Sequence, residues 1–521
     1  MVYELAIIGA GAVGALLARE ASRAGLKVLV LEAEADVASG SSKANSAIVH
    51  GGYAEGPETL KGRLCAQGRA RFPELERELG FGFRPIGSLV LARDLPEDRA
   101  RLEALLARGL ANGLRDLRIV EGPELRELEP AASPEYGLAL YCAGAGICSP
   151  WDLAIAALEA AIGRGAELEL RRPVEAVRRI PSGEAPGGGF WELEAGGFAY
   201  RALAVANAAG LGAEGLDRLA GLEPPRTGAR NGQYIVLDRG TGGLVGHVLF
   251  QLPGPLGKGI LVTPTYQGNL LVGPDAKELE AAEDPAAMLG SDAERLGRIF
   301  ESARRVVPSL SLERAIRSFT GLRCAAEDGD FHVGEAEPER APGWFHALGI
   351  QSPGLTASPA IASLLAGQAA AYLGRGPSAA GPGLEEDAPR RPLPPHLSRR
   401  PERLPPEAAK AAAALPPGEC ERLVCRCEQV REREIAECLD REPRCATLDG
   451  IKRRSRAGMG SCQGQFCRPR VIEFAQRQLG RELDGRERLR DLEALAAAGR
   501  PVARLSGPEL RKLGRELEGR G

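Results

Sequence analysis

A glycine-rich turn between two apolar segments near the N-terminus constrains the fold of this chain more than any other feature. Residues 2–8 (VYELAII) predict a buried strand, and the motif G-x-G-x-x-G follows them directly and opens a helix-forming run. Apolar residues 27–31 predict a second strand. The first glycine permits a tight turn, the second lets backbone amides approach a pyrophosphate, and the third lets the helix lie close to the strand. The sequence therefore predicts an α/β fold with a Rossmann-type site for a dinucleotide, and the three glycines are Gly9, Gly11 and Gly14.

The second predicted strand ends on an acid, Glu32, which lies 18 residues after the last glycine of the motif. A carboxylate at this place accepts hydrogen bonds from a ribose 2′-hydroxyl, and its negative charge disfavours a 2′-phosphate. The free N–H groups and the partial positive charge at the start of the helix suit the pyrophosphate. The motif by itself leaves FAD and NAD open as the ligand.

The composition narrows the partners that this chain can bind. A length of 521 residues predicts about two to four domains, and 44% hydrophobic residues are enough for a large core. The net charge of −3 gives no argument for nucleic-acid binding. No apolar run reaches the roughly 18–20 residues of a membrane span, so no transmembrane segment is expected, while peripheral membrane contact stays open. We therefore expect a cytoplasmic protein that binds no nucleic acid.

A loop rich in small polar residues follows at residues 39–53, and it suits close passage past a ligand. His50 is its candidate base, because the ordinary pKa of histidine, about 6.5, is near neutral. The alternative for His50 is a hydrogen-bonded loop histidine without a catalytic role. The loop has no cysteine pair, which disfavours a flavin disulfide reductase. The other side chains of this loop that could take part in binding or catalysis are those of Asn45 and Ser46.

Between residues 232 and 273, the sequence consists of short strand-forming segments separated by glycine and proline turns. They predict an antiparallel sheet that would roof the ligand site as a second layer. The strands are expected at residues 233–237, 245–251, 259–263 and 269–272. The polar candidates of this region are Lys258, Thr263 and Arg323, and a solvated turn or rim position is the alternative for each.

A second glycine turn at a helix start follows the apolar segment 345–350. Backbone amides at Gly354 would face an anion there, and they would stabilise the negative charge of a reduced flavin. The strand expected at 202–206 also runs into small residues, which suits close backbone approach to a cofactor. Residues 60–80 are amphipathic and mostly helical, and Pro73 is expected to split them into two helices.

Seven of the eleven cysteines lie between residues 420 and 467, and four of them form two close pairs. The spacing is C-x-C, then 34 residues, then C-x-x-x-x-C. In a reducing compartment, paired thiolates indicate metal or iron–sulfur ligation rather than disulfides. Iron–sulfur ligation is favoured because zinc pairs are more often spaced C-x-x-C, although the spacing alone leaves zinc open. The expected ligands are Cys425, Cys427, Cys462 and Cys467, and the expected non-ligands are Cys420, Cys438 and Cys445.

Arginine and lysine side chains surround this cysteine module. They would offset the charge of a cluster, raise its reduction potential or bind an acidic partner, and the alternative is a solvated face. A segment rich in proline and alanine precedes the module at residues 376–419 and predicts a partly extended linker. Residues 481–521 predict a charged helical tail. The basic residues are Lys452, Arg453, Arg454, Arg456, Arg468 and Arg470.

Several runs of sequence resemble one family of flavoenzymes. The run NSAIVHGGYAEGPETLKGRLCAQG is similar to the FAD-dependent dehydrogenases and oxidases of glycerol 3-phosphate and of L-2-hydroxyglutarate. The runs GAGICSPWDL, GKGILVTPTYQGNLLVGP, FTGLRCAAEDGDFHVG and GIQSPGLTASPAIA continue the resemblance in the same order. The C-terminal module, from LVCRCEQV to GSCQGQFCRPRV, resembles the [2Fe–2S] domain of the bacterioferritin-associated-ferredoxin type. The combination resembles catalytic subunits of anaerobic-type glycerol-3-phosphate dehydrogenases, which implies FAD over NAD and iron–sulfur over zinc.

The resemblance implies roles for individual residues. It implies that His50 is the base, that Ser46 lies beside the flavin, and that Lys258 and Arg323 hold the acidic group of the substrate. The glycine motif and the resemblance together give the expected FAD contacts, which are Gly9, Gly11, Gly14, Glu32, Ser42, Asn45, Ser46, Val174, Gly210, Gly354, Leu355 and Thr356.

The implied architecture is a Rossmann-type FAD-binding domain with an antiparallel-sheet substrate domain, followed by a small helical [2Fe–2S] domain. The FAD-binding domain is expected over residues 1–375, with the substrate domain inserted at about 80–145 and 225–325. The cluster domain is expected over 420–480.

The implied activity is oxidation of glycerol 3-phosphate to dihydroxyacetone phosphate, with hydride transfer to flavin N5. The electrons would leave singly through the [2Fe–2S] cluster to a flavoprotein or iron–sulfur subunit, or to a quinone. Three alternatives remain at this point. They are oxidation of L-2-hydroxyglutarate or another 2-hydroxy acid, oxidation of an amino acid or opine, and a non-catalytic assembly subunit with a zinc-stabilised tail.

Overall fold

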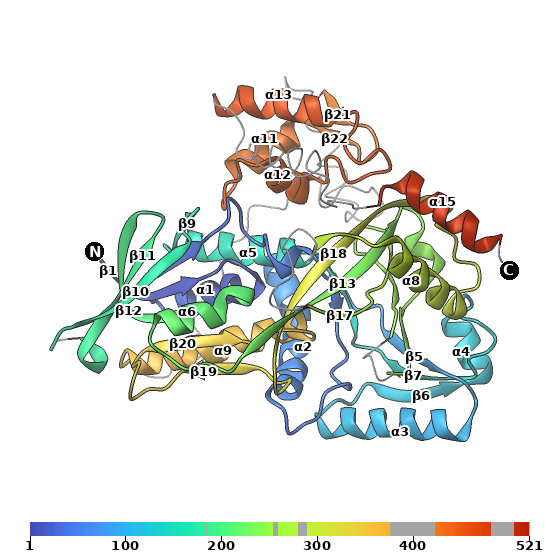
Figure 1. Cartoon of the computed structure of the whole chain (residues 1–521), viewed down its shortest axis with the longest axis horizontal. Coiled ribbons are helices and arrows are strands. Elements are labelled where there is room, and N and C mark those ends of the chain that lie inside the picture. The colour runs from blue at the N-terminus through green and yellow to red at the C-terminus, as the bar shows by residue number, and fades with distance from the viewer. Residues whose placement is uncertain (184, 254–258, 280–288, 376–421, 481–504, 520–521) are drawn as a thin grey trace.

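The computed structural model describes most of the chain, with gaps in the regions drawn as a grey trace (Figure 1). Three sequence predictions, Lys258, Cys420 and the linker at 376–419, lie outside the described residues. Within the described residues, no helix is both long and apolar enough to cross a bilayer. The described residues are 1–183, 185–253, 259–279, 289–375, 422–480 and 505–519.

A mostly parallel sheet of eight strands is built around β1 (Val2–Ile8). β1 pairs in parallel with β2 (Val28–Glu32) on one side and with β12 (Phe198–Asn207) on the other. The strand order is β10-β11-β12-β1-β2-β9, and β20 pairs with both β12 and β19. Every residue of β2 is buried, as expected for a parallel strand covered on both faces. The other strands are β9 (Glu167–Leu170), β10 (Val174–Pro181), β11 (Gly189–Ala195), β19 (His332–Glu335) and β20 (Trp344–Leu348).

Alternate residues of β1 point into two different apolar cores, because side chains along a strand alternate between its faces. Leu5 and Ile7 pack in the core that the four helices of one face complete, whereas Ala6 and Ile8 pack in the core on the other face. α6 (Ala213–Leu219) covers that second face, where it contacts β10 and β20. The four helices are α1 (Ala12–Arg23), α2 (Leu60–Leu79), α5 (Pro150–Gly163) and α9 (Gly354–Tyr372).

The expectation that Pro73 splits the segment 60–80 into two helices is wrong, because α2 runs unbroken through it. A proline inside a helix removes one backbone hydrogen bond. Here the buried face of α2, which includes Phe72 and Leu75, lies against the helical core and keeps the two halves aligned. α2 also approaches α9 closely, since a Cβ at Gly68 would lie 2.1 Å from the carbonyl oxygen of Thr356.

Two distant parts of the chain form one nine-stranded sheet, in the order β17-β13-β16-β15-β14-β5-β7-β6 with β18 paired to β13. All its pairings are antiparallel except β5 with β14. Two apolar cores lie against it. Its strands are β5 (Ser88–Ala92), β6 (Leu117–Glu121), β7 (Leu138–Cys142), β13 (Thr227–Leu237), β14 (Val248–Gln251), β15 (Val262–Pro264), β16 (Leu270–Val272), β17 (Lys277–Glu278) and β18 (Ala315–Ala326), and its helices are α3 (Pro96–Ala111), α4 (Gly122–Leu128) and α8 (Ala293–Val306).

A small sheet connects the two large ones. In it, β8 (Gly146–Cys148) pairs with both β3 (Ile48–Val49) and β4 (Phe83–Arg84). β3 ends immediately before His50, so the loop that carries the candidate base is fixed between the two halves of the molecule. The α/β fold with a second, largely antiparallel sheet is therefore confirmed.

The C-terminal cysteine module is a compact helical unit above both sheets in the view of Figure 1. A hairpin of β21 (Leu423–Cys425) and β22 (Val430–Arg431) precedes its helices. The helices are α11 (Glu432–Asp440), α12 (Leu448–Ser455) and α13 (Arg468–Leu479), which share a small apolar core. We call residues 422–480 the cluster domain.

The end of the chain returns to the second sheet. α15 (Gly507–Glu518) contacts β18 and α8, and Leu510 at its centre is fully buried in their core. The backbone N–H of Ser318 in β18 donates to the carbonyl of Leu505 at 3.0 Å. The charged helical tail expected from the sequence thus includes a helix with a packed apolar side.

Candidate active site

The glycine turn after β1 has no space for side chains at two of its three glycines. Gly9 adopts a φ of +102°, and a Cβ there would lie 2.6 Å from the carbonyl oxygen of Ala208 after β12. A Cβ at Gly14 would lie 1.9 Å from the carbonyl oxygen of Gly9. The turn therefore brings α1 against β1 and against the end of β12, as a dinucleotide site requires.

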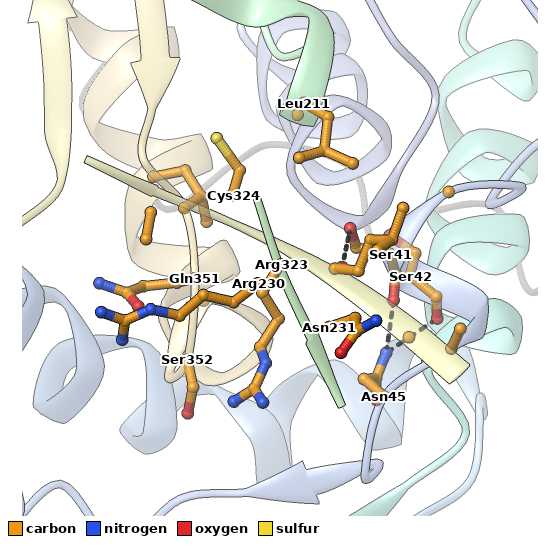
Figure 2. Close-up of a pocket in the computed structure, with 18 of the residues that line it drawn as sticks. Ser41, Ser42, Asn45, Leu211, Arg230, Asn231, Arg323, Cys324, Gln351 and Ser352 are labelled. Carbon is orange, nitrogen blue, oxygen red and sulfur yellow. Dashed lines mark hydrogen bonds between the residues drawn. The ribbon is translucent and has the colours of Figure 1, made fainter. Parts of the chain in front are cut away.

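The polar loop at 39–53 lies across the start of α1. The backbone N–H of Ala12 donates to Ser42 Oγ at 2.9 Å, and a Cβ at Gly11 would lie 3.1 Å from the same oxygen. Asn45 holds the loop in shape, because its Nδ2 donates to the carbonyls of Ser41 and Ser42 at 3.0 Å each (Figure 2). Hydroxyl groups and helix N–H groups thus meet where a pyrophosphate would bind.

Glu32 at the end of β2 is buried, with 9% of its surface exposed. Its two carboxylate oxygens accept from the backbone N–H groups of Ala10 at 2.8 Å and Glu34 at 2.9 Å. Burial raises the pKa of Glu32, and these two hydrogen bonds oppose the rise. A carboxylate has further lone pairs, so Glu32 retains acceptor capacity for a ribose hydroxyl.

One cavity of about 1940 Å³ extends from the glycine turn to the second sheet. It brings together nearly all the residues predicted from the sequence, although Gly14 lies beneath the turn and Lys258 lies outside the described residues. Thr263 does not belong to the described lining, because its buried hydroxyl donates to the carbonyl of Pro264. The predicted residues that line the cavity are Gly9, Gly11, Glu32, Ser42, Asn45, Ser46, His50, Val174, Gly210, Arg323, Gly354, Leu355 and Thr356.

The cavity suits FAD on three observations. Its volume suits a large dinucleotide, its glycine turn has no space for side chains at Gly9 and Gly14, and Glu32 provides the acid for a ribose. α9 adds a row of backbone amides, since this 19-residue helix begins at Gly354 in the cavity wall. These groups line one cavity, in which a nucleotide and a flavin ring would bind.

His50 lies between the start of α9 and the second sheet, and only 6% of its surface is exposed. Its backbone N–H donates to Thr356 Oγ1 at 2.8 Å. Its ring packs 5.2 Å from the ring of Phe250 and 5.8 Å from that of Tyr53, measured between centroids. The imidazole is therefore held where the start of α9 meets the second sheet.

Two arginines face each other across neighbouring strands at the opposite wall of the cavity. Arg230 on β13 and Arg323 on β18 are direct register partners (Figure 2). Like charges in directly opposed positions repel, so an anion between them would be stabilising. Arg230 pairs with Glu278 at 2.6 Å, whereas no carboxylate of the described residues lies within ion-pair distance of Arg323.

Arg323 donates to the backbone carbonyl of Asp275 at 3.2 Å, while the carboxylate of Asp275 is bound by Arg295 at 2.6 and 2.8 Å. Within the part of the chain that the structure describes, the charge of Arg323 at the cavity thus has no carboxylate partner. Gln351 and Ser352, before α9, line the same cavity and lie near both arginines in Figure 2. Sequence reasoning missed Arg230, which could have been found only by extending the strand expected at 233–237 towards its N-terminus.

The two cysteine pairs of the cluster domain are brought together. A hydrogen bond with Cys467 lowers the pKa of Cys425 to about 6, so these thiols from different pairs are in contact. Gly460, two residues before Cys462, packs so tightly that its Cβ would lie 2.3 Å from Cys427 Cβ. The chain therefore closes the C-x-C motif onto the C-x-x-x-x-C motif.

The cysteine arrangement suits a two-iron cluster, because the four thiols come in two close pairs. Each iron of a [2Fe–2S] cluster takes only two cysteine thiolates. Of the cysteines expected to be non-ligands, Cys438 and Cys445 are buried in the same apolar core as Cys425 and Cys467, and Cys445 Sγ donates to the carbonyl of Cys438 at 3.2 Å.

A dinucleotide turn, a long cavity beneath a second sheet and a paired-cysteine domain define a redox enzyme of two cofactor domains. Residues 4–368 match the family model "FAD dependent oxidoreductase", and residues 423–476 match "BFD-like [2Fe-2S] binding domain". The chain belongs to the FAD dependent oxidoreductase family and carries a [2Fe–2S] domain. The prediction of both cofactors is confirmed.

Three relatives illustrate the similarity. The chain is 39% identical over 486 residues to glycerol 3-phosphate dehydrogenase of Caloramator mitchellensis, with 92% of this chain and 95% of that protein covered. It is 26% identical over 412 residues to mitochondrial L-2-hydroxyglutarate dehydrogenase of Arabidopsis thaliana, covering 70% and 82%. The solved structure of FAD-bound L-alpha-glycerophosphate oxidase from Mycoplasma pneumoniae aligns with a TM-score of 0.65 and 26% identity, covering 72% of this chain and 95% of that one.

Proposed function

We propose that this enzyme oxidises glycerol 3-phosphate to dihydroxyacetone phosphate and passes the electrons through its cluster domain. The observation that carries the substrate assignment is Arg323, a cation without a carboxylate partner among the described residues, opposite Arg230 in the cavity that also contains the dinucleotide turn. A phosphate dianion would satisfy both arginines, with Arg323 able to form two parallel hydrogen bonds. The relative from Caloramator mitchellensis, similar over nearly its whole length, supports the same substrate.

The reaction removes two electrons and two protons from a secondary alcohol. When bound, FAD accepts the hydride at N5, and the [2Fe–2S] cluster accepts electrons singly. The chain itself must therefore remove the hydroxyl proton and hold the carbon near the flavin ring. It must also keep water away from the reacting atoms.

His50 is the proposed base for the hydroxyl proton. Its burial against Phe250 and Tyr53 fixes the ring, and Thr356 holds its backbone. General-base catalysis of this kind is worth roughly 10²–10⁴-fold in rate. Ser46, four residues earlier on the same loop, is proposed to position the substrate or the flavin ring.

The start of α9 is proposed to stabilise the reduced flavin. Gly354, Leu355 and Thr356 line the cavity, and the partial positive charge of a helix start stabilises negative charge. The N–H of Gly354 itself donates to the carbonyl of Gln351 at 2.5 Å. Lys258 stays a prediction as a second cation for the substrate, since it lies outside the described residues.

The proposed cluster ligands are the four paired cysteines, and the exit for electrons is the outer side of the same loops. Phe466 lies between two of these cysteines and is 76% exposed, which is unusual for a large apolar side chain. Cys427 is also exposed. Exposed arginines surround this side, so an electron-accepting flavoprotein or iron–sulfur subunit with an acidic surface is the proposed partner; they are Arg426, Arg468 and Arg470.

A 2-hydroxy acid such as L-2-hydroxyglutarate is the second candidate substrate. The same arginines would bind a carboxylate, and the Arabidopsis thaliana relative is a dehydrogenase of that acid. A carboxylate carries less charge than a phosphate dianion, so we rank it below glycerol 3-phosphate for a paired-arginine site.

Anaerobic flavin reduction tests the proposal. We expect glycerol 3-phosphate to bleach the flavin band near about 450 nm, and L-2-hydroxyglutarate and proline to leave it unchanged on the same time scale. Bleaching by L-2-hydroxyglutarate alone would replace the proposal with the second candidate. Bleaching by proline alone would exclude both.

A further inference from the structure

Asp36 is a buried carboxylate that the proposed chemistry does not use. It follows β2 by four residues, and only 3% of its side chain is exposed. It accepts hydrogen bonds from two arginines of the cluster domain, Arg453 Nη2 at 2.5 Å and Arg454 Nη1 and Nη2 at 2.8 and 2.9 Å. These arginine side chains are 3% and 7% exposed. We call these three residues the Asp36 junction.

The charges of the junction are paired, although the buried Nε of Arg453 has no hydrogen-bond partner among the described residues. Arg454 also donates to the carbonyl of Pro443 at 2.9 Å, and Arg453 also pairs with the more exposed Asp449 at 2.7 Å. Burial alone would raise the pKa of Asp36, but the two guanidinium groups lower it below its ordinary value. Asp36 is therefore charged at neutral pH and binds both arginines, and losing it would leave buried cations without their main partner.

The junction joins the cluster domain to the part of the chain that surrounds the dinucleotide. Arg453 Nη2 also donates to the carbonyl of Val37 at 3.1 Å, and the next residue, Ala38, donates its N–H to the carbonyl of Ala10 at 3.0 Å. Ala10 lies inside the glycine turn. Two consecutive hydrogen bonds thus connect α12 with the turn that binds the pyrophosphate.

α12 packs directly onto this point. A Cβ at Gly450, in the first turn of α12, would lie 2.5 Å from Asp36 Oδ2. Other polar contacts between the described part of the cluster domain and the rest of the molecule are more exposed or longer. Among them are Lys43 with Asp449 at 3.2 Å, Arg441 with Glu159 at 2.6 Å, Arg239 with Glu428 at 3.4 Å and Arg456 with Asn269 at 3.2 Å.

We propose that Asp36, Arg453 and Arg454 are positioning residues that hold the cluster domain on the dinucleotide loop and so fix the path of electrons from the flavin to the cluster. This inference rests on the proposed function. The step moves one electron from reduced FAD to the oxidised cluster, and the associated proton passes to solvent. Electron transfer slows steeply as the two centres separate, so loosening the junction slows this step and not the oxidation of substrate.

The test compares Asp36→Ala and Asp36→Asn with the wild-type holoenzyme under anaerobic conditions. Glycerol 3-phosphate bleaching of the flavin is followed by stopped flow, and cluster reduction by electron paramagnetic resonance of rapidly frozen samples. We expect flavin bleaching within about twofold of wild type and cluster reduction slower by at least about tenfold. Lys43→Gln is the control at the same interface, because its ion pair with Asp449 is more exposed than the contacts of Asp36, with side chains 30% and 57% exposed, and Lys43 does not contact Asp36 in any of the described hydrogen bonds.

Small-angle scattering of the holoenzyme gives a readout that does not depend on turnover. We expect a larger radius of gyration for the Asp36 variants and an unchanged value for Lys43→Gln. The double variant Arg453→Lys/Arg454→Lys keeps both charges but loses the paired geometry, so it should give an intermediate rate of cluster reduction. It also serves if Asp36→Ala fails to fold.

Two results would overturn the inference, and both can be distinguished from a result that overturns the proposed function. Unchanged cluster reduction in Asp36→Asn and in the double-lysine variant would show that the junction does not set the electron path. An unchanged radius of gyration in both would show that it does not hold the domains together. Failure of wild-type flavin to bleach would instead remove the proposed function, and scattering would still report on the junction.

Discussion

Arg323 is the residue on which the substrate assignment depends most directly. Replacing it in Arg323→Met removes this cation from the cavity and keeps much of the side-chain volume. Because a hydrogen bond to a charged group is worth about 1.5–3 kcal/mol, we expect KM for glycerol 3-phosphate to rise at least about tenfold. Steady-state kinetics with an artificial electron acceptor measure this change.

Arg230→Met is the matched comparison at the residue scale. Arg230 is the register partner of Arg323 but shares its charge with Glu278, so we expect a smaller rise in KM from its loss. Equal KM values for wild type and Arg323→Met would contradict a phosphate site at these strands.

His50 gives the second prediction at the residue scale. In His50→Ala the ring that we assign as base is lost, and its contacts with Phe250 and Tyr53 are lost with it. We expect flavin bleaching by glycerol 3-phosphate to slow by at least roughly tenfold while FAD stays bound. Stopped-flow absorbance gives the rate, and the flavin-to-protein ratio of the purified variant gives the control. A variant that bleaches at the wild-type rate would exclude His50 as base.

Some residues of the site could be predicted from local sequence motifs. Others could not, because they reach the site only through the pairing of strands that are far apart in the chain. The glycines of the turn and Glu32 lie within one short unit, so their spacing was informative. Arg230 became relevant only through its pairing with Arg323, 93 residues later in the chain, which no local pattern indicates. Asp36 was missed for the same reason, since its partners are more than 400 residues away.

At the scale of elements, α15 gives a stability prediction. Leu510 is fully buried between α15 and the core of the second sheet. Truncating a buried leucine to alanine costs about 2–5 kcal/mol, so Leu510→Ala should lower the melting temperature of the enzyme. Lys512→Ala, at a side chain that is 77% exposed, is the control and should leave it unchanged. Equal melting temperatures for both variants would mean that α15 does not stabilise the sheet in solution.

Helices and strands were predicted best where the spacing of hydrophobic residues followed a single periodicity without interruption. The strands β1 and β2 and the helix after the glycine turn followed from their apolar runs. Pro73 misled the prediction for α2, because tertiary packing against the helical core outweighed one missing hydrogen bond. The packing of α15 on β18 also could not be predicted from the sequence, because the buried side of a charged helix can be identified only when its partner is known.

At the scale of the molecule, the order of the domains along the chain did not predict which domains contact each other. The second sheet takes strands from before and after the first sheet's β12, so its site is complete only when both parts have folded. The cluster domain, separated from the FAD-binding part by a predicted linker, nevertheless packs on it through α12 and α5. The cavity with the proposed substrate site therefore needs both large sheets, while the cluster domain contacts the residues that follow β2.

Separate removal of one cofactor tests this division of labour in the whole molecule. In Cys462→Ser one proposed ligand is lost, so we expect iron and the cluster signal to disappear while glycerol 3-phosphate still bleaches the flavin, because the substrate site lies in the other domain. Cys438→Ala is the matched control, since Cys438 is a buried cysteine of the same domain that is not among the proposed ligands. Iron analysis, absorbance and anaerobic bleaching measure the outcome. The ligand assignment would be overturned if Cys462→Ser kept its iron, or if only Cys438→Ala lost it. Loss of flavin bleaching in Cys462→Ser would show that the two domains do not act separately.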